Sequence, residues 1–271
     1  PCFALLILPK TLFKRDQIAP AFDRNPGRTY QPAPPKSVHL SHKLGKIFNG
    51  RAFTSARRRM RLSLLRRRKP RDLDVAQIIH TIDREKFEKI LARYGMENPG
   101  EEPPKYLDLP RWIEANLRRV RDLELDLGAR KRILDIGSGT GYFLYICGLL
   151  GHDAVGIDLD SYPMFTETTQ LLAVRRSIWR IEKFVPLPDL RPRFDVITAH
   201  MICFNGHKSE SLWGPREWGF FLDDLTRHLT RRGRIWLELN REYDGTCYSP
   251  QLKEYFEKRG AEITDGRVVF S

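Results

Sequence analysis

Residues 132–143 read RILDIGSGTGYF, an apolar run that leads into three alternate glycines and then into a second apolar run. The first run is short and rich in branched residues, which predicts a buried strand, and the second predicts the start of a helix. Because glycine has no β-carbon, Gly137, Gly139 and Gly141 let the loop turn tightly and bring backbone N–H groups against a ligand at the helix N-terminus. The stretch therefore predicts a strand–loop–helix unit that binds a nucleotide-like molecule.

The spacing of the glycines argues against two other kinds of nucleotide site. A dinucleotide loop has the pattern G-x-G-x-x-G, but the sixth position counted from Gly137 is Tyr142, and glycine stands at the fifth. A phosphate loop ends in G-K-[ST], and no such triplet follows.

From Lys131 onward, short apolar runs alternate with helical stretches, which predicts an α/β fold with a doubly wound, mostly parallel sheet. The expected strands are RILDIG, DAVGID, IWRIEKF, FDVITAH and RIWLEL. The expected helices between them cover Tyr142–Leu150, Pro163–Val174 and Glu217–Leu229. AEIT and RVVF flank a D-G turn, which predicts a terminal antiparallel hairpin.

The chain before this α/β domain divides into two segments. Residues 1–70 hold 17 Lys and Arg against two acids, with scattered prolines, so we expect residues 1–71 to be a mostly disordered basic tail. Its arginine-rich part, Arg57–Arg71, is a solvated linker, a lipid anchor or an RNA-contacting arm. Residues 72–127 carry apolar positions at three- and four-residue steps, which predicts helices that form a lid or docking segment.

An acid after the second expected strand belongs to the same predicted site. DAVGID ends in Asp158, where a carboxylate can accept hydrogen bonds from both hydroxyls of a ribose. LDIGSGTG, residues 134–141, and VGIDLD, residues 155–160, resemble the first and second motifs of the class I S-adenosylmethionine-dependent methyltransferases, over about residues 110–271. The alternative is a glycine turn that serves helix packing only, with Asp158 as a strand-end cap.

The resemblance implies S-adenosyl-L-methionine as cofactor and residues 128–271 as a Rossmann-like catalytic domain that binds it. The glycine loop would hold the methionine end, and Asp135 would orient its amino group through water. Asp158 would bind the ribose, Leu159 would pack on the adenine, and Glu182 or Asp189 would contact the adenine edge, with Glu182 preferred. The implied cofactor-binding residues are Asp135, Gly137, Ser138, Gly139, Gly141, Asp158, Leu159 and Glu182.

The substrate side is expected after FDVITAH, because ligands bind outside the carboxyl ends of parallel strands. His200 is the candidate catalytic base there, since the usual histidine pKa of about 6.5 leaves the imidazole mostly neutral near pH 7. A histidine satisfied by backbone hydrogen bonds is the alternative, and His207 ranks below His200. Trp213 and Trp218 either cover a planar substrate or pack the next helix onto the sheet.

Three further features bear on the acceptor. AHMIC, residues 199–203, stands where enzymes that methylate base amino groups have [DNS]-P-P-[YF], which disfavours base N-methylation. Cys203 and Cys247 lack the Pro-Cys context of pyrimidine methylation, so incidental thiols are expected. The stretch from Asn240 to Tyr243 suits either a polar substrate or an exposed loop.

These observations favour a methyltransferase that acts on an oxygen or nitrogen of a small molecule. One alternative is an RNA methyltransferase whose basic tail contacts phosphates, and the other is a catalytically silent cofactor-binding protein that docks on a partner through residues 72–126. The four cysteines contain no C-x-x-C pair, so neither a metal site nor a disulfide framework is expected, and the cytoplasm is favoured. The apolar segment Cys2–Leu8 is far shorter than the roughly 20 residues of a membrane span.

Overall fold

The computed structural model describes residues 73–95, 103–202, 212–242 and 244–271. All of them lie in one compact unit, Arg57–Ser271. The predicted basic tail lies outside the described residues, as do Cys203, His207 and Tyr243. What the sequence predicts for them therefore stays a prediction.

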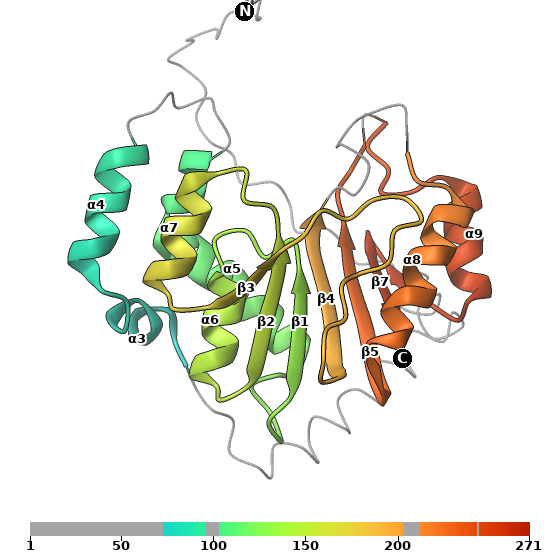
Figure 1. Ribbon diagram of the computed structural model, residues 1–271, viewed down its shortest axis with the longest axis horizontal. Coiled ribbons are helices and arrows are strands. Elements are labelled where there is room, and N and C mark those ends of the chain that lie inside the picture. Colours follow the sequence, from blue (N-terminus) through green and yellow to red (C-terminus); the bar gives the residue numbers. More distant parts are fainter. Residues whose placement is uncertain (1–72, 96–102, 203–211, 243) are drawn as a thin grey trace, which may run out of the picture. The chain divides into compact units, whose positions relative to one another are not determined.

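The described residues form a seven-stranded sheet in the order β3-β2-β1-β4-β5-β7-β6 (Figure 1). Strands β1 to β5 are parallel, and β7 runs antiparallel to both β5 and β6. The predicted doubly wound, mostly parallel sheet with a terminal hairpin is confirmed. The strands are β1 (Arg132–Ile136), β2 (Asp153–Asp158), β3 (Arg175–Ile178), β4 (Phe194–Ile202), β5 (Leu229–Leu239), β6 (Glu262–Thr264) and β7 (Arg267–Phe270).

The third strand differs from its prediction. IWRIEKF was expected, but β3 ends at Ile178, where that stretch begins. The strand contains two arginines, so its sequence lacks the apolar pattern that predicts a strand. Both arginines form ion pairs: Arg175 with Asp153, and Arg176 with Asp160 at 2.9 Å. Because β3 lies at one end of the sheet order, it can carry such polar residues without burying an unpaired charge.

Side-chain caps mark the first turns of α3, α4, α5 and α9. Residues 75–80 and 84–94 form two separate helices. The second begins after Asp83, because the Asp83 carboxylate accepts the backbone N–H of Lys86. The elements are α3 (Val75–His80), α4 (Arg84–Tyr94), the 3₁₀ helix η1 (Pro103–Leu107), α5 (Leu109–Asp122), α6 (Tyr142–Leu149), α7 (Pro163–Leu171), α8 (Pro215–Arg227) and α9 (Pro250–Lys258).

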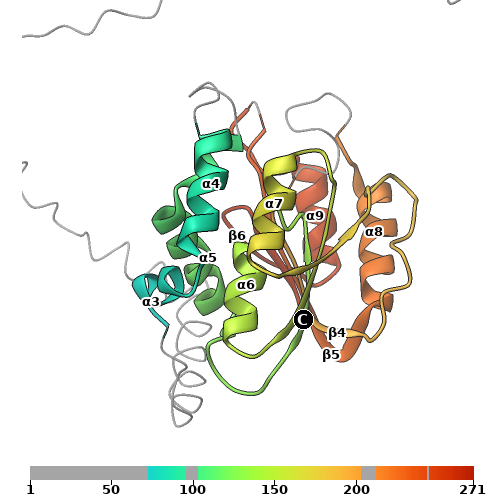
Figure 2. The same cartoon turned by 60° about the vertical axis from the view of Figure 1, so that its left-hand side comes forward.

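The two faces of the sheet carry different helices. In β1, Ile133 packs in a cluster with α3 to α7, whereas Leu134 and Ile136 pack in a second cluster with α8 and α9, because neighbouring strand residues point to opposite faces. Figure 2 shows α5 and α6 on one side of the sheet and α8 on the other. The helical segment before β1 thus shares a hydrophobic core with the sheet, through side chains such as Ile113.

None of the described helices combines the length and the apolar character that crossing a lipid bilayer requires.

Candidate functional site

The glycine loop connects β1 to α6, and its glycines serve different purposes. Gly137, Gly139 and Gly141 have φ angles of 70°, 53° and 82°, in the left-handed region that other residues rarely adopt. A β-carbon on Gly141 would lie 2.7 Å from Cγ2 of Val174, whereas one on Gly139 would meet nothing within 4 Å. Gly141 is therefore needed for the packing of α6, while Gly139 leaves open space beside the loop.

Asp158 ends β2 and joins it to the glycine loop. Its Oδ1 accepts the backbone N–H of Leu159 at 2.7 Å, and its Oδ2 accepts the backbone N–H of Gly139. Burial raises the pKa of the Asp158 carboxyl, against the opposing effect of these two donors and of the charge of Arg176. A carboxylate has about four acceptor positions, so about two remain for the hydroxyls of a ligand. The strand-end cap and a ribose contact are thus compatible.

A cavity of about 730 Å³ opens at the carboxyl ends of β1, β2 and β4. This edge is the topological switch point of the sheet, since β1 lies between β2 and β4. The predicted site residues that line the cavity are Asp135, Gly137, Ser138, Gly139, Asp158, Leu159 and His200.

Two predicted cofactor residues do not line this cavity. Gly141 is the N-cap of α6 and serves packing. Glu182 is exposed and follows Ile181, the last lining residue of the segment after β3. Its contact with the adenine edge stays a prediction.

Residues before β1 also line the cavity; the sequence predicted a lid or docking segment there but no individual site residue. Trp112, Asn116 and Arg119 are spaced by four and three residues, so they share one face of α5 beside its buried apolar stripe. That mixed aromatic and polar face was the available signal. The ring of Tyr106, in η1, lies 4.6 Å from the Trp112 ring and 5.4 Å from the Phe165 ring, and all three rings line the cavity.

The strand order gives the cavity two chemically different ends. Asp158 and Trp179 come from the end of β2 and from just beyond β3. Asp135 and His200 come from β1 and β4, on the other side of the glycine loop. We call these the β2 end and the β4 end.

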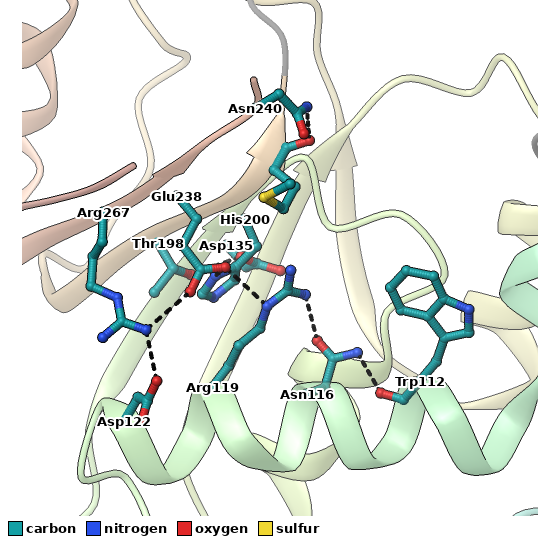
Figure 3. Close-up of polar contacts among 11 residues, drawn as sticks. Trp112, Asn116, Arg119, Asp122, Asp135, Thr198, His200, Glu238, Asn240 and Arg267 are labelled. Carbon is teal, nitrogen blue, oxygen red and sulfur yellow. Dashed lines mark hydrogen bonds and ion pairs between the residues drawn. The ribbon is translucent and has the colours of Figure 1, made fainter. Parts of the chain in front are cut away.

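At the β4 end, ionic side chains join α5 to the sheet (Figure 3). Nε of Arg119 donates to Oε2 of Glu238, in β5, at 3.2 Å, and its Nη1 donates to Oδ1 of Asn116 at 3.0 Å. Nδ1 of His200 lies 3.1 Å from the same Glu238 oxygen. The imidazole ring also packs edge-to-face on Phe143 at 4.8 Å. Glu238 is thus the shared partner of the candidate base and of an arginine from α5.

The same cluster continues away from the cavity. Oε1 of Glu238 lies 3.8 Å from Nη2 of Arg267, which also donates to Oδ2 of Asp122 at 2.7 Å. The Arg267 guanidinium lies over the Trp236 ring at 4.4 Å. Glu238 is therefore held from both sides, and α5 is tied to β5 and β7.

The buried carboxyl of Asp135 and the partly buried carboxyl of Glu238 have opposite pKa shifts. Burial alone would raise the pKa of Glu238, but the hydrogen bond and charge of His200, with the charge of Arg119, lower it to about 2. Burial raises the pKa of Asp135 in spite of the charges of His200 and Arg119 and the hydroxyl of Thr198, which donates to Oδ1 at 2.7 Å. Glu238 is therefore the more firmly ionised of the two.

A smaller cavity of about 300 Å³ lies next to the first, and Asn240 lines both. The Asn240 side chain donates to the carbonyl of Met201 at 2.6 Å. Trp213 and Trp218 also line it, but each is only 5% exposed and their rings pack edge-to-face at 5.6 Å. Both tryptophans thus belong to the core under α8 as well as to the cavity wall. Cys247 lines this cavity too, and burial raises the pKa of its thiol.

The strand order with an antiparallel β7, the glycine loop after β1 and the acid at the end of β2 agree with the fold that the resemblance to the class I S-adenosylmethionine-dependent methyltransferases implies. No family model and no curated protein matches the chain.

Solved structures similar to this chain include three methyltransferases. The ribosomal protein L11 methylase of Lactobacillus delbrueckii subsp. bulgaricus is 12% identical, over 58% of this chain and 73% of that chain, with a TM-score of 0.38. The CcbJ methyltransferase of Streptomyces caelestis is 20% identical over 58% of each chain, with a TM-score of 0.37. An amino pentose methyltransferase of Micromonospora echinaspora, bound to S-adenosylmethionine, is 23% identical over 47% and 49%, with a TM-score of 0.32. The chain spans about half to three-quarters of the length of these proteins.

Proposed function

We propose that the chain is an S-adenosyl-L-methionine-dependent methyltransferase that transfers a methyl group to an oxygen or nitrogen of a small molecule. The observation that carries the proposal is the joining of Asp158 to the glycine loop at the mouth of the 730 Å³ cavity. Its volume lies within the roughly 300–1,000 Å³ of ligand pockets.

The residues at this cavity suit the cofactor group by group. The open space beside Gly139 admits a ligand against the loop backbone, and the spare acceptor positions of Asp158 match ribose hydroxyls. Leu159 and the nearby Trp179 offer apolar surface at the β2 end for an adenine ring. When bound, the cofactor supplies a methyl group on a positively charged sulfur, which is already an activated leaving group.

The chain's own residues then have to position the acceptor and take up its proton. The smaller cavity, which shares Asn240 with the larger one, is our proposed place for the acceptor. Positioning alone lowers the barrier strongly, because in-line attack needs the two reacting atoms held at contact distance. Apolar side chains such as Trp213 and Leu252 in its wall favour a small organic acceptor.

His200 is our proposed general base. Glu238 lies beside Nδ1, an arrangement that favours the tautomer with its proton on Nδ1, and Nε2 has no hydrogen-bond partner among the described residues. His200→Gln should lower kcat by about 100-fold or more with little change in the affinity for cofactor. An unchanged kcat would remove His200 from the mechanism.

The first experiment measures thermal stabilisation by S-adenosylmethionine, S-adenosylhomocysteine and NAD. A ligand at about 100 times its dissociation constant stabilises by about 2.7 kcal/mol, which raises Tm by several degrees at roughly 2 to 4 °C per kcal/mol. Both adenosyl compounds should raise Tm, and NAD should not. Asp158→Asn should abolish most of the rise, while Asp265→Asn, an exposed aspartate that lines neither cavity, should keep it. A folded sample that shows no rise contradicts the proposal.

Transfer of labelled methyl from the cofactor to extract fractions separates the candidate acceptors. Label in the small-molecule fraction supports the proposal, and label in RNA supports the RNA methyltransferase. The RNA alternative also requires binding that weakens steeply with salt, since its basic tail would contact phosphates. Cofactor binding with no labelled product in any fraction supports the silent partner protein. The cytoplasmic location stays a prediction.

A further inference from the structure

The methionine part of the proposed cofactor ends in an α-amino acid group, whose ammonium and carboxylate sit on one carbon. The sequence motifs suggest a partner for the ammonium, the buried carboxylate of Asp135, but none for the carboxylate. A group of opposite charge beside Asp135 would complete the recognition of such a zwitterion.

Arg119 is the cation at that place. Arg119 and Asp135 both line the cavity at its β4 end, and the charge of Arg119 acts to lower the pKa of the Asp135 carboxyl. The other basic lining residues are Lys105, in η1, and Arg180, which follows β3 on the β2 side. The Arg119 side chain is 19% exposed, so it is screened from bulk water but open to the cavity.

The hydrogen bonds of Arg119 leave donors for a ligand. A guanidinium has five N–H donors, and here Nε is used by Glu238 and one N–H of Nη1 by Asn116. The remaining donors have no partner among the described residues. A guanidinium presents its donors in a planar fork that matches the two oxygens of a carboxylate.

We propose that Arg119 binds the carboxylate of the cofactor's amino acid group and that Glu238 positions Arg119 for this contact. The proposal rests on the proposed function. Glu238 is itself fixed by Arg267, which Asp122 holds in turn (Figure 3). The Arg267 guanidinium also lies over the Trp236 ring. A long arginine side chain that is held in advance by such partners loses less conformational freedom on binding.

The test compares two adenosyl ligands that differ in the amino acid group. S-adenosylhomocysteine carries it, and 5′-methylthioadenosine has the same adenosine and thioether without it. Dissociation constants are measured by calorimetry for the unmodified protein, Arg119→Met, Arg119→Lys and the control Arg118→Met. Arg118 is exposed and neighbours Arg119 on α5.

Arg119→Met should raise the dissociation constant of S-adenosylhomocysteine by about 10- to 100-fold, because this ligand has a carboxylate. The dissociation constant of 5′-methylthioadenosine, which has none, should change by less than about threefold. Arg119→Lys should fall between Arg119→Met and the unmodified protein, and Arg118→Met should change neither ligand. An equal loss of affinity for both ligands, or an unchanged affinity for S-adenosylhomocysteine, would overturn the proposal. The unmodified protein serves as the separate check on the proposed function. If it binds neither ligand, the proposed function fails, and the proposed contact between Arg119 and the carboxylate fails with it.

The positioning role of Glu238 is tested in the same assay. Glu238→Gln alone should lower the affinity for S-adenosylhomocysteine but not for 5′-methylthioadenosine. Added to Arg119→Met, it should cause no further selective loss of affinity. A merely structural role would weaken both ligands in both backgrounds, which would refute the positioning role. The ligand ratio is measured within each folded sample, so it does not depend on the variants having equal stability.

Discussion

Replacement of Glu238 by glutamine tests the charge of the buried cluster at the β4 end. The Glu238 carboxyl has a pKa of about 2 in the folded protein, against an ordinary value of 4.5. At about 1.36 kcal/mol per pKa unit, its ionisation contributes about 3 kcal/mol to the free energy of unfolding at neutral pH. Because the folded-state pKa is lowered, this contribution is complete above about pH 4.5 and disappears as the pH falls toward about 2.

Urea unfolding near pH 7 and near pH 3.5 measures this contribution. Glu238→Gln should lower the free energy of unfolding by about 3 kcal/mol at neutral pH, and the difference from the unmodified protein should shrink by about 1 kcal/mol at the lower pH. Glu114→Gln, at an exposed position on α5, is the control and should change little at either pH. A difference that does not depend on pH would refute the assigned pKa. A loss below about 1 kcal/mol at neutral pH would refute the energetic role of the cluster.

Three further predictions concern packing and burial. In urea titrations, Gly141→Ala should lower the free energy of unfolding by about 1 to 3 kcal/mol more than Gly139→Ala. Both glycines have positive φ, but only a β-carbon at Gly141 would collide with Val174, so equal losses would contradict this. Thr198→Val should cost about 1 to 3 kcal/mol, since it removes a buried donor from Asp135, and a neutral result would show that the carboxyl has another partner. The Cys147 thiol, whose pKa burial raises, should react with a thiol reagent only at the rate of unfolding.

Much of the fold could be predicted because its signals are local. RILDIG and FDVITAH are apolar runs that are mostly buried in the sheet, so hydrophobicity alone marks them as strands. The prediction was wrong for β3 because an edge strand can use paired arginines in place of apolar residues. Such pairing joins residues distant in sequence, and no local pattern reports it.

The candidate site divides in the same way. Asp135, Ser138 and Asp158 could be named from motifs and their spacing, and all three line the larger cavity. Trp112 and Arg119 could not, because on α5 they read as one face of an amphipathic helix whose orientation toward the sheet is set by packing.

The strand–loop–helix unit and the acid after the second strand can be predicted from contiguous residues and glycine geometry. Which charges meet depends instead on how the helices pack on the sheet. Arg119 and Glu238 are 119 positions apart and lie on a helix and a strand that touch only when α5 packs on the sheet. The same packing lowers the pKa of Glu238, because the environment of a buried carboxyl is made by the residues that fold around it.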